Sequence, residues 1–269
     1  INTPNAEVSL SAMKIIITGS IAFDYIMTYP GEFKEMLIRE RLDSLSVSFL
    51  VDEMTRHYGG VGPNIAYTLA MLGEHPSLMG AAGRDFPDYQ RHLEGVGVDT
   101  SLVAIHQDIF TSSFFVSTDL KNNQIASFYG GAMQRARDLK LETVSAGRPD
   151  LVVIAPNDPA AMQSYVEECK ALGIPYLYDP GQQIARFAGP EIVRGIEGAD
   201  VLIANEYEFA AIESKTGLAI DQIAQLAHVV IVTRGENGAE IYTDGTVHHI
   251  PIVTPERILD PTGLGDAFR

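Results

Sequence analysis

The chain is predicted to be an α/β protein built on a mostly parallel sheet, with a smaller β-sheet beside it. From residue 150 onwards, short apolar strands alternate with helical segments, which is typical of a parallel sheet covered by helices on both faces. Polar side chains follow several of these strands, as in sheets that bind ligands beyond their carboxyl ends. Residues 103–129 differ, because two β-rich runs flank a polar turn there and predict a hairpin.

In the amino-terminal half, buried strands are expected at residues 14–19 and 77–82, and helices at 65–72 and 86–93. The small sheet is expected to combine residues 21–27, a short strand at 47–51 and the hairpin of residues 111–118 and 124–129.

The carboxy-terminal half continues the alternation up to a last hairpin. We expect strands at residues 151–155, 176–178, 201–204 and 229–233, helices at 159–172, 184–196 (broken around 189–190), 206–215 and 221–226, and a hairpin of residues 239–243 and 247–250.

Composition limits the classes of function. Hydrophobic residues make up 46% and charged residues 20% of the 269-residue chain, which is ordinary for a globular protein without a membrane span. The formal net charge of -16 argues against a nucleic-acid surface. Residues 1–12 lack the features of a signal peptide and are interpreted as a loose tail or cloning remnant before Met13, in a cytoplasmic protein. The single cysteine, Cys169, is interpreted as a packed and inert thiol.

The closing stretch Asp260-Pro261-Thr262-Gly263-Leu264-Gly265-Asp266-Ala267-Phe268 carries the first chemical signal. Its two glycines allow a tight turn, and the apolar pair at its end indicates the start of a helix, whose free amides can hold a phosphate. Asp266 beside such a turn is explained if it removes a proton from a hydroxyl that attacks the phosphate. Taken alone, the motif favours a glycine loop in which Asp266 caps the helix.

A second glycine-rich stretch runs from His57 to Ala66. Gly59 and Gly60 would bring bare backbone against a ligand, while Asn64, just inside the following helix, offers a donor and an acceptor. Asp24 follows the first strand and is either a solvated strand residue or an acceptor for ligand hydroxyls. No Walker-type phosphate loop is present in the sequence.

Three segments in the right order resemble the ribokinase (PfkB-type) family of carbohydrate and nucleoside kinases. They are Gly59-Gly60-Val61-Gly62-Pro63-Asn64-Ile65-Ala66, Asn205-Glu206-Tyr207-Glu208, and residues 260–268. The resemblance covers the chain from about Met13 to its end. It implies a ribokinase-like three-layer α/β sandwich over residues 13–269, with lid segments at about 21–51 and 103–129.

The resemblance also implies a role for each matching residue. Asp266 would be the general base, and the amides of Gly263, Leu264 and Gly265 would form an anion hole for the transferred phosphoryl group. Asp24, Gly59, Gly60 and Asn64 would bind the acceptor's hydroxyls. Glu208, together with Asn205, would organise Mg²⁺ and its waters near the phosphates of ATP. Thr233 and Gly235 would lie at the nucleotide. Asp260 and Thr262 fall where some members bind a monovalent cation such as K⁺.

Two substitutions in the closing motif depart from the family pattern. Pro261 replaces the usual threonine and Leu264 the usual small residue, which puts monovalent-cation dependence in doubt but leaves the base intact. Family members also continue beyond this helix start with segments that enclose adenine, so the resemblance implies that the carboxy-terminal end of the fold lies beyond Arg269.

The expected function is therefore an ATP-dependent kinase of a nucleoside or a simple sugar. The Gly59–Asn64 loop contains no Arg or Lys for an acceptor phosphate, and aromatic residues such as Phe128 could stack on a base. One alternative, a catalytically silent ligand-binding or regulatory protein, is disfavoured by the intact Asp266. Another, a nucleotide-dependent oxidoreductase, lacks its glycine pattern after the first strand. An exposed edge of the small sheet could pair with a second copy, giving a homodimer.

Overall fold

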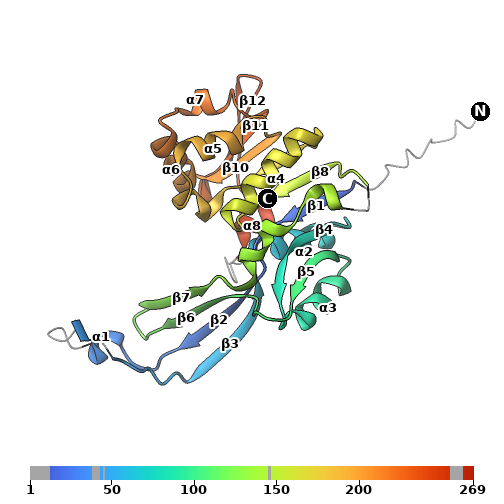
Figure 1. The fold of residues 1–269 in the computed structure, drawn as a ribbon. Helices are drawn as coiled ribbons and strands as arrows, with labels where there is room; N and C mark the ends of the chain where they lie inside the picture. The colour runs from blue at the N-terminus through green and yellow to red at the C-terminus, as the bar shows by residue number, and fades with distance from the viewer. Residues whose placement is uncertain (1–12, 38–42, 45, 145–146, 255–262) are drawn as a thin grey trace, which may run out of the picture.

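The computed structural model describes residues 13–37, 43–44, 46–144, 147–254 and 263–269. Two sheets form the protein (Figure 1). The larger sheet has nine strands in the order β13-β12-β11-β10-β9-β8-β1-β4-β5, and the smaller one has the order β3-β2-β6-β7. All neighbouring pairs from β5 to β11 are parallel, whereas the pairs β11–β12 and β12–β13 are antiparallel. The predicted fold class, a mostly parallel sheet with a small separate sheet, is confirmed.

The strands of the large sheet are short and mostly buried. They are β1 (Ile15–Thr18), β4 (Ser77–Gly83), β5 (Asp99–His106), β8 (Leu151–Ile154), β9 (Tyr176–Tyr178), β10 (Val201–Asn205), β11 (Val229–Thr233), β12 (Ala239–Thr243) and β13 (Thr246–Ile250).

Helices connect these strands and cover the sheet. They are α2 (Val61–Met71), α3 (Pro87–Gly95), α4 (Pro159–Leu172), α5 (Gly189–Ile196), α6 (Glu206–Thr216), α7 (Ile220–Ile223) and α8 (Leu264–Phe268), with 3-10 turns η2 (Gly131–Asp138), η3 (Leu141–Thr143), η4 (Gly181–Ala185) and η5 (Gly235–Asn237). The short helix α1 (Phe33–Met36) lies at the far end of the small sheet.

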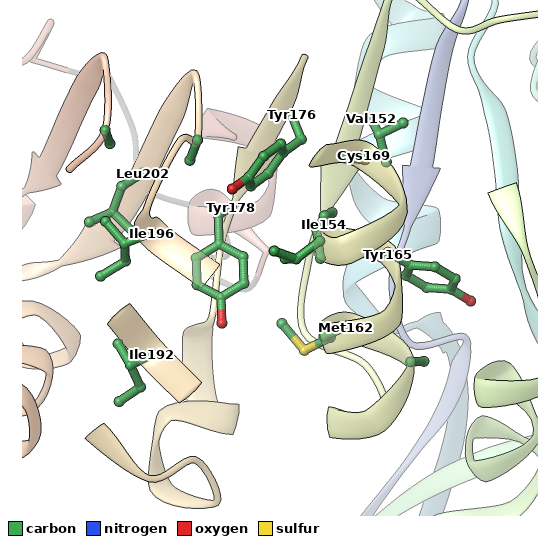
Figure 2. Close-up of a cluster of buried hydrophobic side chains, with 14 of the residues drawn as sticks. Val152, Ile154, Met162, Tyr165, Cys169, Tyr176, Tyr178, Ile192, Ile196 and Leu202 are labelled. Atoms are coloured by element: carbon green, nitrogen blue, oxygen red, sulfur yellow. The ribbon is translucent and has the colours of Figure 1, made fainter. Parts of the chain in front are cut away.

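The hydrophobic core lies on both faces of the large sheet because side chains of a strand alternate between its faces. Val152 and Ile154 pack with α4 and α5 on one face, as Figure 2 shows, whereas Val153 packs with α2 and α3 on the other. Cys169 on α4 is fully buried in the first of these clusters. The interpretation as a packed thiol is confirmed, and burial raises the pKa of the thiol to about 12, with Glu168 and Asp200 adding to the effect.

The small sheet differs from its predicted boundaries. It consists of β2 (Ala22–Thr28), β3 (Glu53–Gly59), β6 (Ser112–Thr118) and β7 (Gln124–Tyr129). The predicted strand at residues 47–51 is wrong, and the strand lies at Glu53–Gly59 instead. That segment is polar and almost wholly exposed, so its sequence lacks the alternation of apolar residues that would predict a strand. It is a strand because it pairs with β2. Residues 103–106 belong to β5 of the large sheet.

Two helical predictions also need correction. The pair Gly189-Pro190 begins α5 and does not interrupt a longer helix, because proline suits the first turn, where its missing amide costs nothing. The helix predicted at residues 221–226 is the shorter α7. None of the helices that the structure describes is long and apolar enough to cross a bilayer.

Candidate functional site

A cavity of about 540 Å³ brings together most of the predicted acceptor residues. Asp24 and Gly60 line it from the amino-terminal part of the chain, and Gly263 and Asp266 line it from the last described segment. Asn64 lines it from the first turn of α2, against which α8 packs. Three motifs that are far apart in the sequence therefore face one cavity.

Asp266 is held directly by Asn64. The Nδ2 atom of Asn64 donates a hydrogen bond of 2.8 Å to Oδ2 of Asp266. Asp266 lies in the first turn of α8, whose N-cap is Gly263, and no side chain caps this helix. The reading of Asp266 as the helix cap is therefore wrong, and its carboxylate is turned toward the cavity that Asn64 also lines.

Gly59 and Gly60 are required by close approaches of the backbone. A Cβ atom on Gly59 would lie 2.3 Å from Oδ2 of Asp24, so the missing side chain leaves room for that carboxylate. Gly60 has φ of 93°, a conformation that favours glycine, and a Cβ there would lie 2.4 Å from the carbonyl oxygen of Ser20. The two glycines thus bring the start of α2 against β1 and β2.

Asp24 lies in β2 at the centre of a cross-strand row. Its Cα partners are His57 on β3 and Phe114 on β6, and Phe114 in turn pairs with Phe128 on β7. Burial raises the pKa of the Asp24 carboxyl above its ordinary value, and the charge of His57 opposes this. Asp24, Phe114 and Phe128 all line the cavity, so one side of the small sheet offers it a carboxyl group followed by two aromatic rings.

The turn before α8 begins the helix with a glycine in the left-handed conformation. Gly263 adopts φ of 75°, and the first hydrogen bond of α8 runs from the Ala267 amide to the Gly263 carbonyl at 2.9 Å. The amides of Leu264, Gly265 and Asp266 have no acceptor among the described residues. Asp260 and Thr262 of the same motif lie outside the described residues.

The Asn205-x-x-Glu208 motif forms a capping box at the start of α6. Oδ1 of Asn205 accepts from the Glu208 amide at 2.8 Å, and Oε2 of Glu208 accepts from the Asn205 amide at 2.9 Å. The sequence carries a signal for this capping box, because an asparagine that can cap a helix is followed three positions later by a glutamate. Asn205 pairs in register with Thr233 on β11, so these two predicted nucleotide residues are neighbours. Gly235 follows in η5, and no described contact joins it to Asp266.

Arg269 joins the two ends of the site, which the sequence did not predict. Its guanidinium forms an ion pair with Asp179 and lies 3.7 Å from Oε2 of Glu208 and 3.6 Å from Oδ1 of Asp266. Asp179 follows β9 and is completely buried. Burial raises the pKa of its carboxyl to about 7; Arg269 lowers it and Glu208 raises it further. Its position directly after a buried strand was the available signal.

The donor set of this region fits a hydrated divalent cation. The described residues contain no group of three or more His, Cys, Asp or Glu side chains arranged to hold a metal directly. Mg²⁺ usually keeps several waters and takes only one or two carboxylates together with phosphate oxygens. Asp179, Glu208 and Asp266 already share one cationic group, the guanidinium of Arg269, and their oxygens are the hard donors that Mg²⁺ prefers.

Comparison with known proteins extends these findings. Residues 18–269 match the sequence model of the family described as "pfkB family carbohydrate kinase". The chain is 31% identical over 258 residues to a nucleoside kinase of Methanothermobacter thermautotrophicus, with 95% of the chain and 80% of that protein aligned.

Solved structures show the same similarity. A nucleoside kinase of Burkholderia thailandensis in complex with inosine is 37% identical, with a TM-score of 0.81, covering 95% of this chain and 81% of that one. The same protein in complex with ADP-inosine is similar with a TM-score of 0.79 and 36% identity, covering 94% and 79%.

Proposed function

The chain belongs to the pfkB family of carbohydrate kinases, and on this basis we propose that it transfers the γ-phosphoryl group of ATP to the hydroxymethyl group of a nucleoside. The nucleoside kinases described above support a nucleoside, and the complex with ADP-inosine supports an adenine nucleotide as phosphoryl donor. One structural observation carries the proposal. The hydrogen bond from Asn64 to Asp266 joins the acceptor motif to the carboxylate of the glycine turn, inside a cavity large enough for a small ligand.

In the proposed reaction, Asp24, Gly59, Gly60 and Asn64 hold the sugar hydroxyls. Asp266 accepts the proton of the attacking hydroxymethyl group while the oxygen of that group forms a bond to the γ-phosphorus. The bond from the γ-phosphorus to the bridging oxygen breaks, and ADP leaves with the electron pair. Asn64 donates a hydrogen bond to Oδ2 of Asp266. The proton would therefore be taken by Oδ1, or by Oδ2 once the hydrogen bond from Asn64 has lengthened.

Charge on the transferred group would be stabilised by the glycine turn. The amides of Leu264 and Gly265 have no other acceptor among the described residues, and the positive φ of Gly263 turns the chain into α8. Amides held in advance in this way cost no reorganisation during the reaction. The glycine turn is therefore proposed as the anion hole, with Asp266 adjoining it.

Mg²⁺ and the nucleotide would be held on the side of Glu208. Glu208, with Asp179 beside it, would hold waters of the metal ion, and Asn205, Thr233 and Gly235 would contact the nucleotide. Bound Mg²⁺ would neutralise charge that develops between the β- and γ-phosphates. The role of Arg269 in this scheme is to keep the carboxylates of Asp179 and Glu208 near one another before the metal binds.

The small sheet is proposed to act as a lid over the acceptor. Its row of Asp24, Phe114 and Phe128 forms one wall of the cavity, so closing it would exclude water, which competes as a phosphoryl acceptor. No described feature favours a catalytically silent protein.

The proposal is tested by measuring ADP release from Mg²⁺-ATP with a panel of acceptors. The panel contains inosine, guanosine, adenosine, cytidine, ribose, fructose and fructose 6-phosphate. We expect nucleosides to be phosphorylated with kcat/KM at least ten times that of the free sugars. Turnover of none of them would refute the kinase, and a preference for a free sugar would refute the nucleoside acceptor.

A further inference from the structure

Part of the cavity wall is formed by the short segment η4, which follows Asp179. Gln182, Gln183 and, just beyond η4, Arg186 line the cavity together with Phe114 and Phe128. The backbone of this segment is fixed at Gly181, which has φ of 45° and whose Cβ would lie 2.4 Å from Cγ of Pro156. The backbone of this segment is thus constrained beside a cavity that two aromatic rings also line.

The distance of the rings from Asp24 suits the base of a nucleoside. Neighbouring strands are about 4.8 Å apart. Phe114 is one strand from Asp24 and Phe128 is two. A ribose held at Asp24 would therefore place its base along Phe114 and Phe128, since an aromatic ring packs against the flat faces of a base.

Gln183 is a buried polar group that lacks a partner. The side chain is 7% exposed, and its Oε1 atom is shielded from solvent without a hydrogen bond to any described residue. An unsatisfied buried amide destabilises a protein by about 1–3 kcal/mol, so such groups are usually satisfied. Gln183 lines the cavity, and the edge of a bound base would supply the missing partner.

Arg186 is exposed to solvent and forms no ion pair with another described residue, although the chain is strongly acidic. Its guanidinium can only donate hydrogen bonds, and its forked shape matches two adjacent acceptors. It is also the one Lys or Arg among the described residues that line the cavity. The flanking Phe114, Phe128 and Met133 are unsuited to an acceptor phosphate, which is strongly hydrated.

From this arrangement we infer that Gln183 and Arg186 read the edge of the base and select 6-oxopurine nucleosides over adenosine and pyrimidine nucleosides. This inference rests on the proposed nucleoside kinase activity. In a 6-oxopurine, N7 and O6 are adjacent acceptors and match an arginine fork, whereas adenine presents an amino donor in place of O6. The unsatisfied Oε1 of Gln183 is an acceptor, and it suits the N1–H of a 6-oxopurine, on the edge next to N7 and O6.

The inference is tested with Arg186→Met, which keeps the length of the side chain and removes its donors. We expect kcat/KM for inosine and guanosine to fall roughly 5- to 150-fold, the discrimination of one bidentate contact. The value for adenosine should change less than about threefold, and 7-deazaguanosine, which lacks N7, should respond less than guanosine. Arg91→Met is the matched control, because Arg91 is exposed and Asp88 is its one ion-pair partner among the residues that the structure describes.

A second variant separates recognition from stability. Gln183→Met removes the unsatisfied amide, so we expect the affinity for inosine, measured by calorimetry without ATP, to fall while the free energy of unfolding stays equal or rises. A purely structural glutamine would instead lose stability. Gln225→Ala, at an exposed glutamine on the surface, serves as the matched control.

The outcomes distinguish this inference from the proposed function. If the wild-type protein phosphorylates nucleosides but Arg186→Met leaves the inosine-to-adenosine ratio unchanged, the inference is wrong and the kinase proposal stands. Loss of fructose 6-phosphate turnover in Arg186→Met, with nucleosides unaffected, would assign Arg186 to an acceptor phosphate and overturn the inference. If no nucleoside is a substrate of the wild-type protein, the proposed acceptor itself fails.

Discussion

Asn64 and Asp266 lie 202 positions apart in the chain, and Nδ2 of Asn64 donates to Oδ2 of Asp266 at 2.8 Å. The hydrogen bond exists because α8 packs against the first turns of α2. It orients the carboxylate that we assign as the base, using a side chain that we assign to the acceptor. Binding of the acceptor and orientation of the base are therefore expected to be linked.

Replacing Asp266 by asparagine should remove the base while keeping its shape. The amide oxygen introduced by Asp266→Asn can still accept a hydrogen bond from Asn64, so we expect kcat to fall by roughly 10²- to 10⁴-fold with little change in the dissociation constant of ADP. Single-turnover kinetics and calorimetric ADP titration measure the two quantities. Unchanged turnover would remove Asp266 from its assigned role.

Replacing Asn64 by alanine should affect both the acceptor and the base. Loss of the 2.8 Å hydrogen bond frees the Asp266 carboxylate, so kcat should fall about tenfold and the KM for inosine should rise, while the KM for ATP stays within about twofold. Steady-state kinetics with each substrate varied in turn provide the measurement, again with Gln225→Ala as control. An equal rise in both KM values would contradict a role confined to the acceptor side.

Gly60→Ala should destabilise the fold at the start of α2. The residue has φ of 93°, and an added Cβ would lie 2.4 Å from the Ser20 carbonyl oxygen. Strain of this type costs about 1–3 kcal/mol per residue, which urea unfolding would detect. Gly95→Ala is the control, because a Cβ there meets nothing within 4 Å and is expected to be neutral or slightly stabilising. Equal stability of both variants would show that α2 can shift without cost.

Asp119 should make the small sheet sensitive to acid. Burial acts to raise the pKa of its carboxyl, but hydrogen bonds from the Asn123 side chain and from the amides of Phe33, Asn123 and Lys121 outweigh it and lower the pKa to about 2. A lowered pKa means that the ionised form stabilises the folded state above the ordinary value of 3.8, and that this contribution is lost as pH falls toward 2.

We therefore expect Asp119→Asn to be less stable than the wild-type protein at pH 7, with the difference shrinking between about pH 4 and about pH 2. Urea unfolding at several pH values, followed by amide exchange of Phe33, checks this window. A difference independent of pH would indicate that shape, and not charge, matters at this position.

Local signals made parts of the fold predictable from sequence. The bounds of α4 were expected at 159–172, because Pro159 suits the first turn and Gly173 ends the helix with φ of 64°. The Asp158 side chain completes this by accepting from the amides of Ala160 and Ala161. The acceptor motif and the closing motif were likewise recognised from glycine spacing.

Other parts depend on partners distant in sequence and were missed. β3 is an exposed strand whose residues carry no apolar alternation, so only its pairing with β2 reveals it. The ion pairs of Arg269 with Asp179 and Glu208 involve side chains from three separate connections of the sheet. Their meeting depends on the order of the strands, which no local pattern contains.

The constrained backbone around Gly181 has a consequence for evolution. It stands between Asp179, next to the proposed phosphoryl chemistry, and Gln183, next to the proposed base edge. Under the proposed assignment, mutations at 183 and 186 would change the preferred acceptor without disturbing the carboxylate of Asp179. Acceptor preference and turnover would then be separable traits, and a laboratory library restricted to these two positions should yield altered acceptor preferences at little cost in kcat.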